Sequence, residues 1–420
     1  MTAILFFSFF ALLLLGVPIA FSVAIAGTIV LIVGDIPLVL IAQRMFAATD
    51  SFPLVAVPFF ILAGDLLARG AISKRLVEFA EAIMGQVRGA LSVVSVVAGM
   101  FFAAISGSGA ATTAAVGATL IPELKARNYQ EGSAAALIAS AGCIGVVIPP
   151  SVPMVLYAVI ADQSVTRLFK NGFIPGFMMG GVLIVIALRQ AYTNNYPKGT
   201  PFTFKRFMQT MLPALWGLLM PLIILGGIFS GMFTPSEAAA VAVIYAALVS
   251  AFIYRDLSMK ELIQILAGSA RTSAVIMIII ACSGIFGWVL ANWKIPEAVA
   301  QTVISVSNNP YIILFLISVI ILIAGIFMET SSAVILLTPV FLPLVKMMGI
   351  DLVHFGILFT VGIAIGMITP PVAINLFVAS SITGMRIEEI AKAVVPYLLG
   401  LIVMFLIYVY IPMMFPGIIF

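Results

Sequence analysis

Charged residues are scarce in this 420-residue chain: they make up 9% of it, against 63% hydrophobic residues. A soluble domain has about 25% charged residues, so the composition excludes a water-soluble globular protein. Mean hydropathy is +1.26. Since one membrane span takes about 20 apolar residues, the length allows roughly eleven to thirteen spans or part-spans. The apolar runs are too long for the strands of an outer-membrane barrel. We therefore expect an all-α polytopic membrane protein.

Cysteine and histidine are nearly absent. Cys143 and Cys282 both lie in apolar runs, which excludes a disulfide framework and a cysteine metal site. His354 is the only histidine, which excludes a multi-histidine metal centre. An intramembrane enzyme needs a nucleophile with a base, paired carboxylates or a metal set. The sequence offers none of these, so we expect no enzymatic activity and no cofactor. The net charge of +4 is typical of cytoplasmic loops rich in lysine and arginine and does not indicate nucleic-acid binding.

The longest polar stretch, 189–210, holds four basic residues and no acidic residue. We interpret it as a linker between two hydrophobic halves, 1–188 and 211–420. Its basic excess favours the cytoplasmic side of the membrane.

The two halves resemble each other. A shift of 221 positions aligns their punctuating residues without a gap. The matched pairs are Pro122 with Pro343, Lys125 with Lys346, Gly145 with Gly366, Pro149-Pro150 with Pro370-Pro371, and Pro175 with Pro396. This pattern predicts an internal duplication, which is typical of secondary transporters. If each half has an odd number of spans, the two repeats are inverted relative to each other.

Each half has one apolar run that contains a proline pair, at about 134–160 and 353–381. Two consecutive prolines remove two backbone donors and break a helix. In a bilayer the carbonyls left without partners must be satisfied internally or line a cavity. Na⁺ prefers oxygen ligands, so we expect two broken helices that offer carbonyl groups to a cation. The alternative is a simple proline kink packed against neighbouring helices.

Upstream of each break, a small polar cluster interrupts a short apolar stretch. The clusters are 106–109 (Ser-Gly-Ser-Gly) and 329–332 (Glu-Thr-Ser-Ser). The apolar segments on either side of each cluster are too short to be two full spans. They predict two re-entrant helical hairpins, at about 91–121 and 311–345. The second arm of each hairpin would point its free N–H groups at a bound anion. The alternative for the serine and glycine cluster is close packing of helices by small residues.

Four isolated ionisable residues differ in the role that their sequence context indicates. Glu329 lies in an apolar stretch and is a functional candidate, as a cation ligand, a proton carrier or a charge at a helix start. Glu237 completes a capping box with Thr234, which favours a structural role. Asp65 remains open between a core-facing carboxylate and an ion pair with Arg69. His354 is interpreted as a loop residue.

Five stretches resemble a known family. They are Phe-Phe-Ala-Ala-Ile-Ser-Gly-Ser-Gly at 101–109, Ile-Pro-Pro-Ser at 148–151, Phe-Thr-Pro-Ser-Glu-Ala-Ala-Ala at 233–240, Leu-Thr-Pro-Val-Phe-Leu-Pro at 337–343 and Ile-Thr-Pro-Pro-Val-Ala-Ile-Asn at 368–375. The chain resembles the large membrane subunit of tripartite ATP-independent periplasmic (TRAP) transporters along essentially its whole length. One departure is Glu329, where the family is expected more often to have aspartate.

The resemblance implies an elevator-type fold of the ion-transporter superfamily, with two inverted repeats, in the bacterial inner membrane. It implies Na⁺-coupled import of small organic anions such as C4-dicarboxylates or sialic acid. A periplasmic binding protein would deliver the substrate, and a small four-helix membrane subunit would complete the complex. A stand-alone Na⁺/anion symporter of the same superfamily remains the alternative, and a channel is disfavoured by the duplicated breaks.

The resemblance also implies three sets of ligands. The first cation site would use Ser106, Ser108 and the carbonyls near Gly145, Ile148 and Pro149. The second would use Glu329, Thr330, Thr369 and the carbonyls near Gly366 and Pro370. The substrate site would use Gly107, Gly109, Ser151, Ser331 and Asn375.

Overall fold

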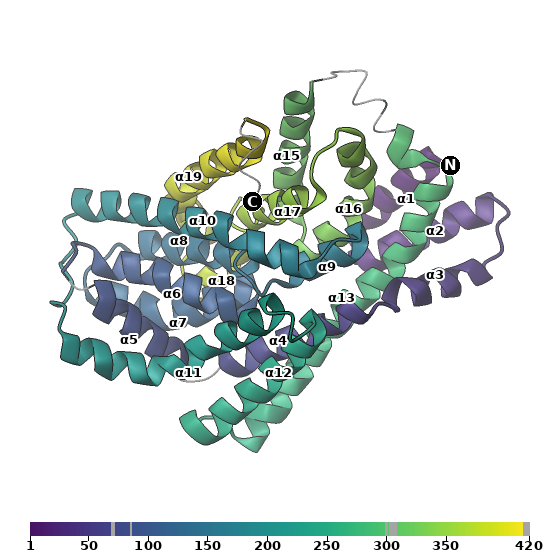
Figure 1. The fold of residues 1–420 in the computed structure, drawn as a ribbon. Coiled ribbons are helices and arrows are strands. Elements are labelled where there is room, and N and C mark those ends of the chain that lie inside the picture. Colours follow the sequence, from purple (N-terminus) through teal and green to yellow (C-terminus); the bar gives the residue numbers. More distant parts are fainter. Residues whose placement is uncertain (69–71, 85, 299–300, 302–308, 415–420) are drawn as a thin grey trace.

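A computed structural model describes residues 1–68, 72–84, 86–298, 301 and 309–414 (Figure 1). The helices of the first half are α1 (Thr2–Leu14), α2 (Ile19–Val33), α3 (Val39–Thr49), η1 (Phe52–Val55), α4 (Ala56–Ala68), α5 (Ile72–Met84), α6 (Ala90–Ser106), α7 (Gly109–Ala126), α8 (Glu131–Gly142), η2 (Cys143–Val146), α9 (Val152–Ala161) and α10 (Val165–Thr193). Those of the second half are α11 (Phe204–Phe229), α12 (Pro235–Leu248), η3 (Val249–Tyr254), α13 (Met259–Asn292), α15 (Pro310–Phe327), α16 (Thr330–Met347), α17 (Leu352–Gly366), α18 (Ile374–Thr383) and α19 (Ile387–Met414).

The described residues are helical apart from their connections, and an isolated β-bridge joins Arg88 to Lys198. Within the described ranges, six helices are long and apolar enough to cross a membrane, or seven spans if the pair α3 and α4, bent by 68°, counts as one. Eight further apolar helices have 10–17 residues. The expected all-α polytopic membrane protein is therefore confirmed, with many part-spans among its helices.

Apart from α5, the helices pack in two groups. The first group combines α1–α4 with α11–α13, and its closest pairs are α4 with α12 and α13 with α2 and α3. The second group combines α6–α10 with α15–α19, and α7 and α8 pack there against α18. Each group thus mixes both halves of the sequence. The groups meet where α13 packs on α16 and where α4 packs on α6 and α9.

Polar side chains define where many of these helices begin. Ser108, Ser151, Ser164, Thr234, Ser258, Asn309, Glu329 and Asp351 each accept a hydrogen bond from the first turn of the helix that follows. Such caps satisfy N–H groups that have no partner within the helix. The capping box expected on α12 is confirmed: the Thr234 N–H donates to Glu237 at 2.8 Å, and the Glu237 N–H donates to Thr234 at 3.3 Å.

The interpretation of His354 as a loop residue is wrong. Asp351 caps α17, and the His354 N–H donates to its carboxylate at 2.9 Å, so the histidine lies in the first turn of the helix. Its ring lies 5.1 Å from the ring of Tyr408 on α19. The capping role of Asp351, three residues earlier, is the signal that indicated a helix here.

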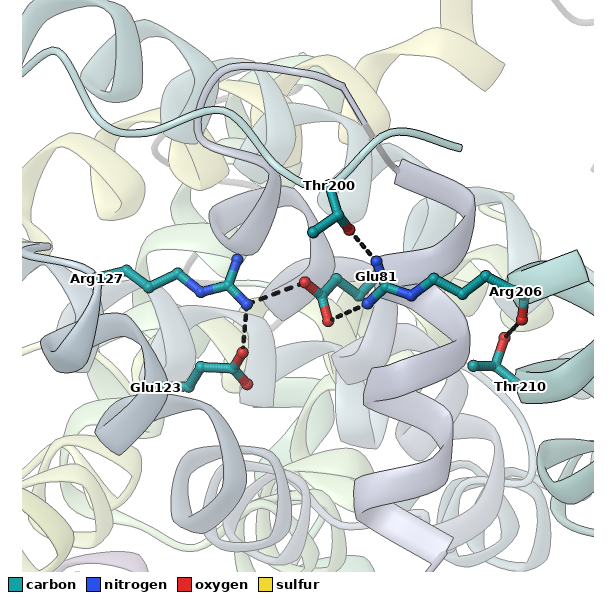
Figure 2. A network of polar contacts seen from close by, with 6 residues as sticks. All are labelled: Glu81, Glu123, Arg127, Thr200, Arg206 and Thr210. Carbon is teal, nitrogen blue, oxygen red and sulfur yellow. Dashed lines mark hydrogen bonds and ion pairs between the residues drawn. The ribbon is translucent and has the colours of Figure 1, made fainter. Parts of the chain in front are cut away.

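A cluster of charged side chains links α5 to both groups of helices (Figure 2). Glu81 of α5 accepts from Arg127, which follows α7, at 3.1 Å and from Arg206 of α11 at 3.0 Å. Arg127 also pairs with Glu123 at 2.7 Å, and Arg206 donates to Thr200. Burial by itself lowers the pKa of Arg127, but its hydrogen bond and charge interaction with Glu81 raise the pKa overall. The guanidinium therefore stays charged.

We expect Glu81→Gln to lower the midpoint of thermal unfolding in detergent. Breaking a fully buried ion pair costs about 3–5 kcal/mol. The side chain of Glu81 is only 9% exposed, but those of its two arginines are 33% and 35% exposed, so solvent screening reduces the expected loss to about 1–2 kcal/mol. The matched control is Glu123→Gln, because Glu123 is 35% exposed and pairs only with Arg127. Equal shifts in both variants would contradict a central role for Glu81.

Candidate functional site

A cavity of about 470 Å³ lies where the two helix groups meet. The tips of both hairpins line it with residues 106–111, Glu329, Ser331 and Ser332. The first group contributes Ile61, Gly64 and Asp65 of α4 and Arg271, Thr272, Val275, Ile276 and Ile279 of α13. Val146, Val152, Pro153, Met367 and Ile374, beside the two helix breaks, complete the wall. Its volume and its mainly apolar lining are typical of small-molecule sites.

The first hairpin turns at Gly107. This residue ends α6 with φ of +59°, and an added Cβ would lie 2.7 Å from the carbonyl oxygen of Pro150. Ser108 follows and caps α7 by accepting from the Ala111 N–H at 3.4 Å. Because a side chain fits neither the backbone conformation nor the space at Gly107, this position requires glycine. Gly109, Ala110 and Ala111 of the first turn of α7 line the cavity.

Oxygen atoms gather behind this turn. The hydroxyls of Ser106 and Thr112 lie 2.8 Å apart, and Thr112 donates to the carbonyl of Ser108 at 2.8 Å. The η2 segment packs directly against them: an added Cβ at Gly145 would lie 2.5 Å from the Thr112 hydroxyl and 2.6 Å from the Ser108 carbonyl oxygen. Hydroxyl and carbonyl oxygens are the donors that hard cations prefer, so this donor set fits Na⁺.

The second hairpin turns at Glu329, which caps α16. Its carboxylate accepts from the N–H groups of Ser331 at 2.9 Å and Ser332 at 3.2 Å, and from the Ser331 hydroxyl at 3.1 Å. Thr330 is fully buried, and its hydroxyl lies 3.3 Å from the sulfur of Met367. Ser108 and Glu329 are 221 positions apart, and each caps the second arm of its hairpin. Both tips thus begin their second arm with a side-chain cap, but the capping residue is neutral in the first and a carboxylate in the second.

Both helices that contain the proline pairs break where the sequence indicates. The Pro149-Pro150 and Pro370-Pro371 bonds are both cis. After the first pair, Ser151 donates to the Val146 carbonyl at 2.5 Å and caps α9. Before the second pair, Thr369 donates to the Ile365 carbonyl at 2.9 Å. An added Cβ at Gly366 would overlap the backbone of Gly325 in α15, so the second break is packed tightly against its hairpin.

Asn375 lies outside the cavity wall. It is fully buried, and its Nδ2 donates to the Ala139 carbonyl of α8 at 3.1 Å. Its Oδ1 has no hydrogen-bond partner among the described residues. Asn375 therefore links the second broken helix to the first, and its role as a substrate ligand stays a prediction.

The structure thus brings together part of the expected site. Ser106, Gly107, Ser108, Gly109, Glu329 and Ser331 line one cavity. Ile148, Ser151 and Thr330 are buried away from it in the packing of the breaks and the second hairpin. Whether any of these residues binds an ion or a substrate stays a prediction. Within the described residues, no three histidine, cysteine or carboxylate side chains lie close enough to hold a metal ion together.

Thr112 and Arg271 are absent from the expected site residues, and the sequence leaves Asp65 open between two roles. Thr112 lies one helical turn after Ser108, and this spacing indicates one face of a helix. Asp65 lines the cavity and accepts from Ser269 of α13 at 2.6 Å, while Arg69, its suggested partner, lies outside the described residues. Arg271 precedes a long uncharged run, and an ionisable residue in that position is itself a functional signal.

Comparison with solved structures indicates the class of protein first. The chain has a TM-score of 0.66 to the crystal structure of the YdaH transporter of Alcanivorax borkumensis, at 15% identity, covering 90% of this chain and 88% of the other. MtrF of Neisseria gonorrhoeae gives a TM-score of 0.58 at 14% identity, covering 89% and 85%. The fold is therefore one found in membrane transporters.

Sequence comparison then gives the family. Residues 6–414 match the model described as the tripartite ATP-independent periplasmic transporter, DctM component. The C4-dicarboxylate TRAP transporter large permease protein DctM of Pseudomonas aeruginosa is 40% identical, covering 89% of this chain and 87% of that protein. The sialic acid large permease protein SiaM of Vibrio cholerae is 33% identical, covering 94% and 93%.

A third relative is the isethionate TRAP transporter permease protein DctMQ of Oleidesulfovibrio alaskensis, which is 40% identical over 98% of this chain. The chain spans 66% of the length of that protein. These matches show that the chain belongs to the family of TRAP transporter large permeases. It is a multi-pass membrane transporter component and not an enzyme.

Proposed function

We propose that this chain is the permease of a Na⁺-coupled importer of small organic anions. Its relatives are named for C4-dicarboxylates, sialic acid and isethionate, which are all organic acids. The observation that supports the proposal best is the cavity itself, since hydroxyl and carbonyl oxygens suited to Na⁺ and the N-terminus of α7, suited to an anion, lie at its edge. Na⁺ is the coupling ion of the proposal, and no other cofactor is needed.

The proposed mechanism is an elevator. The group of α1–α4 and α11–α13 would be the fixed scaffold, and the group of α6–α10 and α15–α19 would carry the hairpin tips across the membrane. The cavity lies between these groups, so movement of one past the other would expose it to each side in turn. A small four-helix membrane subunit and a periplasmic binding protein are the proposed partners, in the bacterial inner membrane.

Uptake into proteoliposomes tests this proposal. The chain would be reconstituted with its small subunit, and its binding protein would be supplied outside with labelled succinate, sialic acid or isethionate. We expect accumulation that requires both an inward Na⁺ gradient and the binding protein. Equal uptake without the binding protein would favour a stand-alone symporter instead. A flux that never saturates with Na⁺ or substrate would indicate a channel.

A further inference from the structure

Among the described residues that line the cavity, Arg271 is the only basic one. It lies on α13, at the start of the run 272–293, which contains no charged residue. A guanidinium at the edge of such a run is expensive to keep in apolar surroundings, and such residues usually face an aqueous cavity or a partner. Arg271 lines such a cavity.

Six other arginines of the chain are held by the protein itself, whereas Arg189 and Arg386, which do not line this cavity, have no side-chain partner among the described residues. Arg44 lies 5.6 Å from the ring of Trp288, and Arg75 lies 3.9 Å from that of Tyr254. Arg88, Arg127, Arg167 and Arg206 hydrogen-bond or form ion pairs with side chains. The side chain of Arg271, in contrast, has no hydrogen bond, ion pair or ring contact with any residue that the structure describes.

The two carboxylates in the same wall have other donors. Asp65 accepts from the hydroxyl of Ser269 at 2.6 Å. Glu329 accepts three hydrogen bonds from the first turn of α16. The positive charge of Arg271 therefore faces the cavity without a carboxylate of the protein bound to it.

We propose that Arg271 binds the acidic group of the transported molecule and thereby selects for anions. The planar guanidinium matches a carboxylate or sulfonate through two parallel hydrogen bonds. This inference rests on the proposed function. It adds that the anion is recognised from α13, in the first helix group, as well as from the hairpin tips in the second. A bound anion would then contact both groups at once.

Arg271→Gln and Arg271→Lys test the proposal in the full complex with its binding protein. Hydrogen bonds to charged groups are strong enough that we expect Arg271→Gln to raise the KM for the organic acid roughly tenfold to a hundredfold. Arg271→Lys should raise the KM less, because the positive charge remains while the two parallel N–H donors of the guanidinium are lost. The Na⁺ concentration for half-maximal uptake should stay unchanged. Arg255→Gln is the matched control, since Arg255 does not line the cavity and its one side-chain partner in the part of the chain that the structure describes is the carbonyl of Phe252.

An unchanged KM in Arg271→Gln would overturn the proposal. If the maximal rate falls while the KM stays unchanged, Arg271 has a structural role instead. A further readout does not need turnover. In Val275→Cys, which keeps Arg271 and places a thiol one helical turn away in the same wall, bound organic acid should slow labelling by a thiol reagent, and adding Arg271→Gln should remove this protection. Cys143 and Cys282 are buried. Labelling that ignores the acid would also contradict the proposal. If the unmodified complex takes up no organic acid, the proposed function fails, whatever the variants do.

Discussion

Alanine at Gly145 is expected to abolish Na⁺-driven uptake, with a loss of at least tenfold. The added Cβ would lie 2.5 Å from the Thr112 hydroxyl and 2.6 Å from the Ser108 carbonyl oxygen. Neither atom can move away easily, because the Ser108 oxygen belongs to the backbone and the Thr112 hydroxyl is held by hydrogen bonds. The η2 segment must therefore move away from α7, which separates the oxygens proposed to hold Na⁺. Overpacking of this kind usually costs about 1–3 kcal/mol.

Gly181→Ala is the control for this variant. Gly181 lies in α10, and an added Cβ there would meet nothing within 4 Å. Alanine inside an open helix position is tolerated or mildly stabilising. Uptake would be compared at equal amounts of monodisperse protein, measured by size-exclusion chromatography. Uptake by Gly145→Ala within twofold of the unmodified protein would rule out the proposed cation site at this break.

Glu329→Gln is expected to raise the Na⁺ concentration for half-maximal uptake at least tenfold. Glutamine keeps one side-chain oxygen that can cap α16, so the hairpin tip should survive, but the negative charge is lost. At an effective dielectric constant of about 20, a unit charge about 8 Å from a cation contributes about 2 kcal/mol. This exceeds the roughly 1.4 kcal/mol that corresponds to a factor of ten in an equilibrium constant.

Two further variants separate charge from capping. Glu329→Ala removes the cap as well and should lower stability by about 1 kcal/mol, beyond any effect of Glu329→Gln. Glu237→Gln alters a carboxylate that caps α12 outside the cavity, and its Na⁺ dependence should stay normal. If Glu329→Gln has the Na⁺ dependence of the unmodified protein, Glu329 serves only to begin the helix.

Much of this architecture follows from local chemistry in the sequence. Low charge and long apolar runs predict the membrane class, and the family resemblance is confirmed by matches along nearly the whole chain. The capping box at Glu237 is a short-range feature, so the sequence alone predicts it correctly. The proline pairs locate both helix breaks because proline cannot donate a backbone hydrogen bond.

The orientation of side chains at the breaks is less accessible to sequence analysis. Ser151 and Thr369 were expected to offer ligands, but in the structure their hydroxyls bond to nearby carbonyls of the broken helices. A polar residue next to a helix end has several unsatisfied backbone groups within reach, and only tertiary packing decides between them. The same reason hides Asn375, which bonds across to α8, more than two hundred residues earlier in the chain.

Arg271 and Asp65 show a second limit. Neither belongs to a duplicated motif, and they face the hairpin tips only because α4 and α13 pack beside them. The proposed elevator movement, the inverted repeats and the Na⁺ ligands are statements about motion and occupancy, and they stay predictions that the uptake experiments address.

The two hairpin tips also give the cavity an electrical polarity. At equivalent places in the two halves, a neutral serine begins α7 and a negatively charged glutamate begins α16. The second tip thus carries a carboxylate that the first tip lacks. In a duplicated protein with identical tips, the two tips would attract a given ion equally. Here the two tips differ by one formal charge, so they would attract a cation and an anion unequally, and the charges of Asp65 and Arg271 in the same wall add to that field.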